Sequence, residues 1–135
     1  MASKFKQLNV LLVDDHEILR DELSLFLTSK IPNIHLAIAS SGEEALRMIE
    51  NNSELPDIIL SDLDMLKISG KDLCVQLQKS HPLIKVVILS MHNEKGLIID
   101  LYKSGAWGFL SKADIQTELI HVFSHIAEEK KYFPS

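Results

Sequence analysis

The sequence predicts an α/β domain in which five parallel strands form one sheet with helices on both faces. Short apolar runs rich in Val, Ile and Leu recur five times along the 135 residues. Stretches with helical spacing of apolar residues separate these runs. The runs are continuously apolar rather than alternating, which is typical of strands buried on both faces of a parallel sheet.

The strands are predicted from the apolar runs and from the turn residues beside them. Pro32 and Pro56 stand just before the second and third runs, where proline interrupts regular structure. The predicted strands are 8–13, 34–39, 57–61, 85–90 and 108–111.

The helices are predicted from apolar residues spaced three and four apart, which share one face of a helix. Ser41 opens the second helix, Pro82 follows the third and Gly105 closes the fourth. The predicted apolar faces are Leu19, Leu23, Phe26 and Leu27 in the first helix, Ala45, Met48 and Ile49 in the second, and Ile115, Leu119, Val122 or Phe123, and Ile126 in the last.

Composition and charge fit one globular domain, residues 1–135, with its core at about 8–130. The chain is 46% hydrophobic and 24% charged, and 19 acids against 14 Lys and Arg leave a formal charge of -5. This balance lacks the basic surplus of a domain that binds nucleic acid on its own. Its apolar runs are strand-sized and its first ten residues resemble no signal peptide, so we expect a cytoplasmic protein without a membrane segment.

The single cysteine, Cys74, has no partner for an internal disulfide. Its neighbours Leu73, Val75 and Leu77 indicate a packing position on a helix. No basic residue or histidine stands beside it in sequence, so we expect a structural rather than a reactive thiol.

Polar side chains follow four of the five predicted strands. Asp14 and Asp15 come directly after the first strand, and Asp62 follows the third. Ser90 ends the fourth strand and Lys112 follows the fifth. Because the carboxyl ends of parallel strands meet at one edge of the sheet, we expect these groups to lie close together.

Such a cluster is suited to phosphoryl transfer. Three carboxylates held this close together repel one another, and their pKa values are raised unless a cation is present. Mg²⁺ prefers oxygen ligands and retains several waters, so it suits such a site. Lys112 can pair with Asp62 at rest and with a phosphoryl group later, and the Ser90 hydroxyl can donate to another phosphoryl oxygen. A carboxylate nucleophile is therefore predicted.

These residues resemble the receiver domain of two-component response regulators, a CheY-like family. The resemblance covers residues 8 to about 130, and each motif alone is weak, whereas their order together is specific. The motifs are Asp14-Asp15 after the first strand, "DLDMLKISG" from Asp62 to Gly70, Ser90 at the end of the fourth strand, and "SGAWGFLSK" from Ser104 to Lys112.

The resemblance implies a flavodoxin-like fold with strand order 2-1-3-4-5 and a signalling domain rather than an enzyme. Asp62 would take a phosphoryl group from a phosphohistidine of a sensor histidine kinase, and Ser90 and Lys112 would then hold it. The only reactions expected of the chain itself are self-phosphorylation from phosphodonors and autodephosphorylation.

The resemblance also implies a Mg²⁺ site. Asp15 and Asp62 would bind the ion directly, Asp14 would bind it through water, and the main-chain carbonyl of Asp64 would add a ligand. The alternative is a structural role in which Asp14 and Asp15 cap the N-terminus of a helix, a position where acidic residues are favourable.

Family receivers couple the site to the surface of the fourth helix, fifth strand and fifth helix. The switch pair implied here is Ser90 and Phe109. Phenylalanine stands where the family usually has tyrosine, so any switch must act by packing alone. Trp107 lies at the start of this surface and either anchors a partner or covers the edge of the core.

Asp64 and His92 flank the expected phosphoryl position. One interpretation is that they tune attack by water and hence the lifetime of the phosphorylated state, and the other is that both are exposed loop groups. Two departures from the family pattern lie nearby. Leu66 stands where the family usually has proline, so its loop gains backbone freedom and an amide donor, and Ala113 stands where many members have a proline after the lysine, so a cis bond there would be more costly.

The remaining histidines are predicted to have structural or surface positions. His121 and His125 have a spacing that can bind zinc, but no third ligand is evident. His16, His35 and His81 are expected at element boundaries or on the surface.

Two other functions remain as alternatives. "DLD" at 62–64 also resembles the nucleophile motif of haloacid-dehalogenase-type phosphatases, although that family begins its domain with the motif. A flavodoxin-like cofactor binder would need a Gly- or Ser/Thr-rich phosphate loop after the first strand, which is missing here.

The tail "IAEEKKYFPS" resembles the junction before the helix-turn-helix domain of NarL/FixJ-type regulators. We therefore expect a chain truncated before a C-terminal DNA-binding domain. The full-length protein would bind DNA through that domain, as a homodimer promoted by phosphorylation.

Overall fold

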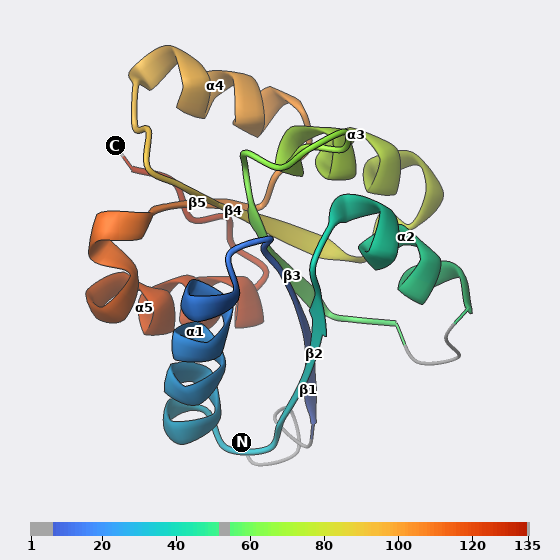
Figure 1. Ribbon diagram of the computed structural model, residues 1–135. Helices are drawn as coiled ribbons and strands as arrows, with labels where there is room; N and C mark the ends of the chain where they lie inside the picture. Colours follow the sequence, from blue (N-terminus) through green and yellow to red (C-terminus); the bar gives the residue numbers. More distant parts are fainter. Residues whose placement is uncertain (1–6, 52–54, 135) are drawn as a thin grey trace.

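The computed structural model describes residues 7–51 and 55–134 and places one sheet between two layers of helices (Figure 1). All strand pairings are parallel, as the apolar runs predicted, and the strand order is β2-β1-β3-β4-β5, as the family resemblance implied. The strands are β1 (Leu8–Val13), β2 (Ile34–Ala39), β3 (Ile58–Asp62), β4 (Lys85–Ser90) and β5 (Gly108–Ser111). Only β3 differs from its predicted bounds, because it is shifted by one residue and includes Asp62.

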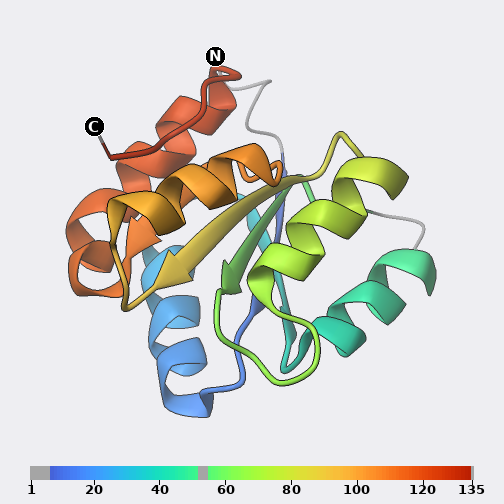
Figure 2. The ribbon, with the colours of Figure 1, turned by 90° about the horizontal axis from the view of Figure 1, so that it is seen from above.

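Helices cover both faces of the sheet. Figures 1 and 2 show α1 and α5 on one side and α2 and α3 on the other, with α4 beside α3. The helices are α1 (Glu17–Lys30), α2 (Gly42–Asn51), α3 (Gly70–Ser80), α4 (Lys95–Lys103) and α5 (Ile115–Ala127), with a short 3₁₀ turn at Lys112–Asp114 before α5. In the described part of the chain, no helix is both long and apolar enough to cross a membrane.

The sheet separates two apolar cores, which explains its continuously apolar strands. Successive strand residues point to opposite faces, so Leu11 and Ile59 pack toward α2, α3 and α4, whereas Leu12 and Leu60 pack toward α1 and α5. The predicted helix faces are confirmed, because their members are buried or packed against these cores. Cys74 is also buried as predicted, and burial raises the pKa of its thiol to about 12.

The C-terminal segment after α5 returns to the edge of the sheet (Figure 2). The Phe109 amide donates to the Tyr132 carbonyl at 2.9 Å, and the Tyr132 amide donates to the Trp107 carbonyl at 2.9 Å. The Lys85 and Lys131 ammonium groups lie 4.9 and 5.6 Å from the centre of the Trp107 ring. The segment at Tyr132 therefore covers the outer edge of β5, and the Trp107 ring packs against two lysine side chains.

The start of α3 is held close under the end of β3. Ser69 and Asp72 form a reciprocal capping box at the helix N-terminus, and the Gly70 amide donates to the Leu63 carbonyl at 2.9 Å. A Cβ atom at Gly70 would lie 2.6 Å from the Asp62 carbonyl oxygen and 2.9 Å from the Ile88 side chain. The glycine is thus required by the close approach of α3 to the strand that carries Asp62.

We predict that Gly70→Ala lowers the free energy of unfolding by about 1–3 kcal/mol, because the added methyl group meets backbone that cannot move away. The matched control is Gly96→Ala, where the new Cβ would have nothing within 4 Å. Gly96 lies in α4, so alanine there should stabilise by about 0.5 kcal/mol. Urea denaturation of both variants checks the opposite signs, and equal effects would contradict the close approach at Gly70.

Candidate functional site

Four polar groups meet at the carboxyl edge of the sheet, where β1 and β3 lie side by side. Asp14 follows β1, Asp62 ends β3, Ser90 ends β4 and Lys112 follows β5. The Lys112 Nζ lies 3.0 Å from Asp62 Oδ1 and 3.9 Å from Asp14 Oδ2. The predicted convergence of residues from distant parts of the sequence is therefore present.

Burial makes the charge balance of this cluster unfavourable. The Asp14 and Asp62 side chains are 0% and 3% exposed, and Lys112 is 11% exposed, so two buried carboxylates face one ammonium group. Burial raises the pKa of Asp62, and the nearby Asp14 charge raises it further. The hydrogen bond and charge of Lys112, together with a hydrogen bond from the Asp64 backbone, oppose this rise without cancelling it.

Two buried oxygen atoms in the cluster have no hydrogen-bond partner among the described residues, namely Asp14 Oδ2 and Asp62 Oδ2. An unpaired buried carboxylate oxygen is costly, and a bound cation is one way to remove the cost. Asp14, Asp15, His16 and Asp62 can each offer one ligand atom, and these atoms all lie within 4.8 Å of one another. The donor set thus fits a divalent cation, and its three carboxylates suit Mg²⁺.

The alternative that Asp14 and Asp15 form a helix cap is wrong. The N-cap of α1 is His16, which makes no side-chain capping hydrogen bond, and the acid in the first turn is Glu17. Asp14 Oδ1 instead accepts a hydrogen bond from the His16 amide at 2.8 Å. The two aspartates face the cluster at the end of the strand.

His16 belongs to the cluster, which the sequence interpretation missed. Its side chain is 66% exposed, as expected of a boundary residue, yet its Nδ1 lies 3.0 Å from Asp14 Oδ1 and 3.2 Å from Asp15 Oδ1. The only signal in the sequence was its position directly after the two aspartates. A side-chain rotamer decides whether such a residue points into the site or away from it.

The predicted switch residues occupy buried positions near the site. Ser90 is fully buried, and its Oγ accepts a hydrogen bond from the His92 amide at 2.9 Å. Phe109 is 1% exposed and packs in the core on the side of α2, α3 and α4. Their roles in switching stay predictions.

Asp64 and His92 lie at the mouth of the site rather than inside it. Their side chains are 70% and 60% exposed, and His92 Nε2 lies 4.0 Å from Asp64 Oδ2. The Asp64 carboxylate lies outside the set of side chains that can hold a metal ion. The metal ligand predicted from Asp64 is its main-chain carbonyl, which stays a prediction.

Of the two positions that depart from the family pattern, Ala113 adopts a local structure that proline would not, whereas Leu66 lies in an exposed turn. Leu66 is 83% exposed. Lys67, the next residue, has a left-handed backbone with a φ of 65°, which few residues other than glycine adopt. The Ala113 amide donates to Ser111 Oγ at 3.3 Å, a hydrogen bond that proline cannot make. No peptide bond is cis in the described residues.

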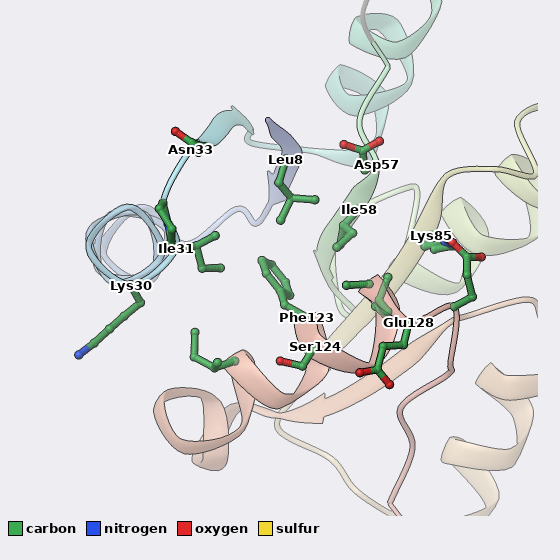
Figure 3. Close-up of a pocket in the computed structure, with 15 residues that line it drawn as sticks. Leu8, Lys30, Ile31, Asn33, Asp57, Ile58, Lys85, Phe123, Ser124 and Glu128 are labelled. Atoms are coloured by element: carbon green, nitrogen blue, oxygen red, sulfur yellow. Dashed lines mark hydrogen bonds and ion pairs between the residues drawn. The ribbon is translucent and has the colours of Figure 1, made fainter. Parts of the chain in front are cut away.

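Other features of the molecule lie apart from this cluster. His125 Nδ1 is 2.8 Å from the His121 carbonyl oxygen, and within residues 7–51 and 55–134 neither histidine belongs to a group that could hold a metal ion. A largely apolar hollow of about 710 Å³ lies at the opposite edge of the sheet, between α1 and α5 (Figure 3). Leu8, Ile58 and Phe123 line it, and no member of the acidic cluster does.

Comparison with known proteins finds a match to the family model described as the response regulator receiver domain, over residues 10–124. The transcriptional activator ExaE of Pseudomonas putida is 39% identical over 106 residues, which cover 78% of this chain and 49% of that protein. The response regulator UvrY of Escherichia coli K12 is 30% identical over 95% of this chain and 58% of its own length.

A solved structure with the same fold is a LuxR family DNA-binding response regulator from Silicibacter pomeroyi. It has a TM-score of 0.81 and 29% identity, and the match covers 95% of this chain and 97% of that one. The chain spans about half the length of the curated relatives it matches.

We predict that Asp62→Asn raises the free energy of unfolding of the metal-free protein at pH 7 by about 1 kcal/mol. The pKa of Asp62 is raised, so its charge costs stability above the folded pKa, and this cost disappears as the pH falls to the ordinary value of 3.8. Denaturant unfolding at pH 7 and near pH 4 measures both effects.

The control is Asp21→Asn, an exposed acid on α1, which should change stability by less than about 0.5 kcal/mol. A loss of stability in Asp62→Asn at pH 7 would show that the ion pair with Lys112 outweighs the cost of burial.

Proposed function

Since this chain belongs to the family of response regulator receiver domains, we propose that Asp62 accepts a phosphoryl group from a phosphohistidine of a sensor histidine kinase. The observation that carries the proposal is the pairing of a buried Asp62 with Lys112 at 3.0 Å. Family membership removes the support for the haloacid-dehalogenase-type alternative, which rested on "DLD" alone.

The two oxygens of Asp62 have different surroundings, which assigns them different roles in the proposal. Oδ1 lies beside Lys112, whereas Oδ2 lies 3.7 Å from His16 Nδ1 on the side of the aspartate cluster. Oδ1 is then the nucleophile that bonds to phosphorus. The phosphorus–nitrogen bond of the donor breaks, and its electron pair stays on the nitrogen. The Lys112 ammonium group would then pair with the negatively charged phosphoryl oxygens.

Asp14, Asp15 and Asp62 would hold a divalent cation, with Mg²⁺ as the family's ion and the Asp64 carbonyl as a further ligand. When bound, the ion supplies positive charge that offsets the carboxylates and the incoming phosphoryl oxygens. The unpartnered Asp14 Oδ2 and Asp62 Oδ2 support this assignment. In autodephosphorylation the oxygen of a water molecule would bond to phosphorus while the bond from phosphorus to the Asp62 oxygen breaks, and the products would be the carboxylate, inorganic phosphate and a proton from the water.

The response to phosphorylation would run through Ser90 and Phe109 to the surface of α4, β5 and α5. Ser90 Oγ accepts from the His92 amide, and its hydroxyl hydrogen would donate to a phosphoryl oxygen. β4 and β5 are paired at Ser90 with Ser111 and at Ile88 with Phe109, so a change at one strand end reaches the other strand. Phe109 would respond by packing alone, since it has no hydroxyl.

The wider role proposed for the whole protein is control of transcription in the cytoplasm. The relatives named above are a transcriptional activator and a response regulator, and this chain covers only part of each. We propose that DNA is bound through a domain outside these 135 residues and that phosphorylation promotes a homodimer. The formal charge of -5 supports a signalling rather than a DNA-binding role for this part.

We predict that acetyl phosphate with Mg²⁺ adds one phosphoryl group to the protein and that Asp62→Asn abolishes the addition, because Lys112 Nζ lies 3.0 Å from this carboxylate and 3.9 Å from that of Asp14. Intact-mass spectrometry and peptide mapping measure the adduct. Asp64→Asn is the matched control, since its exposed carboxylate lies at the same rim, and it should still be phosphorylated. A stable adduct on another residue, or steady turnover of phosphate esters, would contradict the proposal.

We predict that Asp64→Asn and His92→Ala each change the half-life of the phosphorylated protein at least about threefold, because both side chains flank the path by which water reaches the phosphoryl group. Loss of ³²P from the purified phosphoprotein measures the half-life. Asp21→Asn, far from the mouth, should leave it unchanged. Half-lives equal to that of the wild type in both rim variants would make them exposed loop groups without a tuning role.

A further inference from the structure

His16 places an imidazole nitrogen among three carboxylates. Its Nδ1 lies 3.0 Å from Asp14 Oδ1, 3.2 Å from Asp15 Oδ1 and 3.7 Å from Asp62 Oδ2. Atoms that share one octahedral cation at about 2.1 Å stand roughly 3.0 Å apart when adjacent and 4.2 Å apart when opposite. The measured separations fall in that interval, so one ion could contact the nitrogen and the oxygens after small shifts.

The backbone of His16 is fixed by hydrogen bonds, and its ring is positioned by the contact of Nδ1 with Asp14 Oδ1. Its amide donates to Asp14 Oδ1 at 2.8 Å, and its carbonyl accepts the Arg20 amide at 3.0 Å as the first hydrogen bond of α1. Arg20 in turn donates to the Asp14 carbonyl at 3.0 Å. The strand end and the helix start therefore fix the backbone from which the imidazole reaches the cluster.

Two further atoms show that this cluster is incomplete without a ligand. Asp14 Oδ2 and Asp62 Oδ2 are buried and unpartnered among the described residues, on side chains 0% and 3% exposed. Lys112 does not complete the cluster, since it lies 3.9 Å from Asp14 Oδ2 and pairs with the other oxygen of Asp62. His16 Nδ1 lies 3.7 Å from Asp62 Oδ2, so it is within reach of a cation bound at that oxygen.

We propose that His16 is a nitrogen ligand of the cation and makes the site bind Mn²⁺ more tightly than Mg²⁺. The inference rests on the cation site of the proposed function and adds a ligand to it. Imidazole is a poor ligand for Mg²⁺, which prefers oxygen, whereas first-row transition ions accept nitrogen and oxygen together. His16 is thus the residue that determines the metal preference of the site, while the carboxylates supply its charge.

The test is Mn²⁺ binding to the whole 135-residue protein, followed by electron paramagnetic resonance without any phosphodonor. Free Mn²⁺ signal gives the affinity, and pulsed measurements detect the ¹⁴N nucleus of a bound imidazole. Wild type should show the nitrogen signal. His16→Asn should lose it and bind Mn²⁺ about tenfold more weakly, while Mg²⁺ affinity, measured by competition, changes much less.

His92→Asn is the matched control, because its imidazole lies at the same rim but 4.0 Å from Asp64 and outside the cluster. It should keep both the nitrogen signal and the Mn²⁺ affinity. Asp62→Asn should lose Mn²⁺ binding, which places the ion at the cluster. Thermal unfolding of each variant verifies that the fold is retained.

Mn²⁺ bound to wild type without a nitrogen signal would overturn the inference and leave the proposed function intact. Tighter Mn²⁺ binding in His16→Asn would overturn it as well, since the imidazole would then compete with the ion for the carboxylates. Wild type that binds neither Mn²⁺ nor Mg²⁺ would overturn the cation site itself, and with it the proposed function.

Discussion

The surplus of buried negative charge at the carboxyl edge of the sheet is the constraint on which the proposed chemistry depends. Asp14 and Asp62 are out of contact with water, and Lys112 is the one ammonium that reaches them within the described residues. Taken alone, this arrangement costs folding free energy. The surplus of buried negative charge is explained if the site binds a divalent cation and accepts a phosphoryl group. Function, rather than stability, then accounts for these residues.

The remainder of the fold serves to hold these charges in place. Parallel pairing brings the ends of β1, β3, β4 and β5 to one edge, so groups far apart in the sequence become neighbours. Two apolar cores fix the sheet from either side. At Gly70 the helix after β3 lies too close to the strand to allow a side chain. A rigid scaffold of this kind suits chemistry that depends on positioning and charge.

Apolar patterns predicted the parallel sheet and its helix layers, and strand ends predicted the meeting of Asp62 with Lys112, whereas the strand order followed from the family resemblance. Strand burial, helix faces and strand ends each have a period or a position that the sequence displays. His16 was missed because its place in the cluster depends on a side-chain rotamer that no period encodes. The pairing of Tyr132 with β5 was missed for a related reason, since it is a single long-range backbone contact after the last helix. The one-residue shift of β3 lies within the usual uncertainty of element ends.

The most direct test of the central claim is the ionisation of Asp62 itself, followed by NMR of the ¹³C-labelled side-chain carboxyl carbon. The account predicts a pKa above 3.8 in the metal-free protein, because burial is the largest influence on it. Saturating divalent cation should then lower this pKa, because the ion stabilises the charged form. An Asp62 that titrates at its ordinary value and is indifferent to the cation would contradict the account.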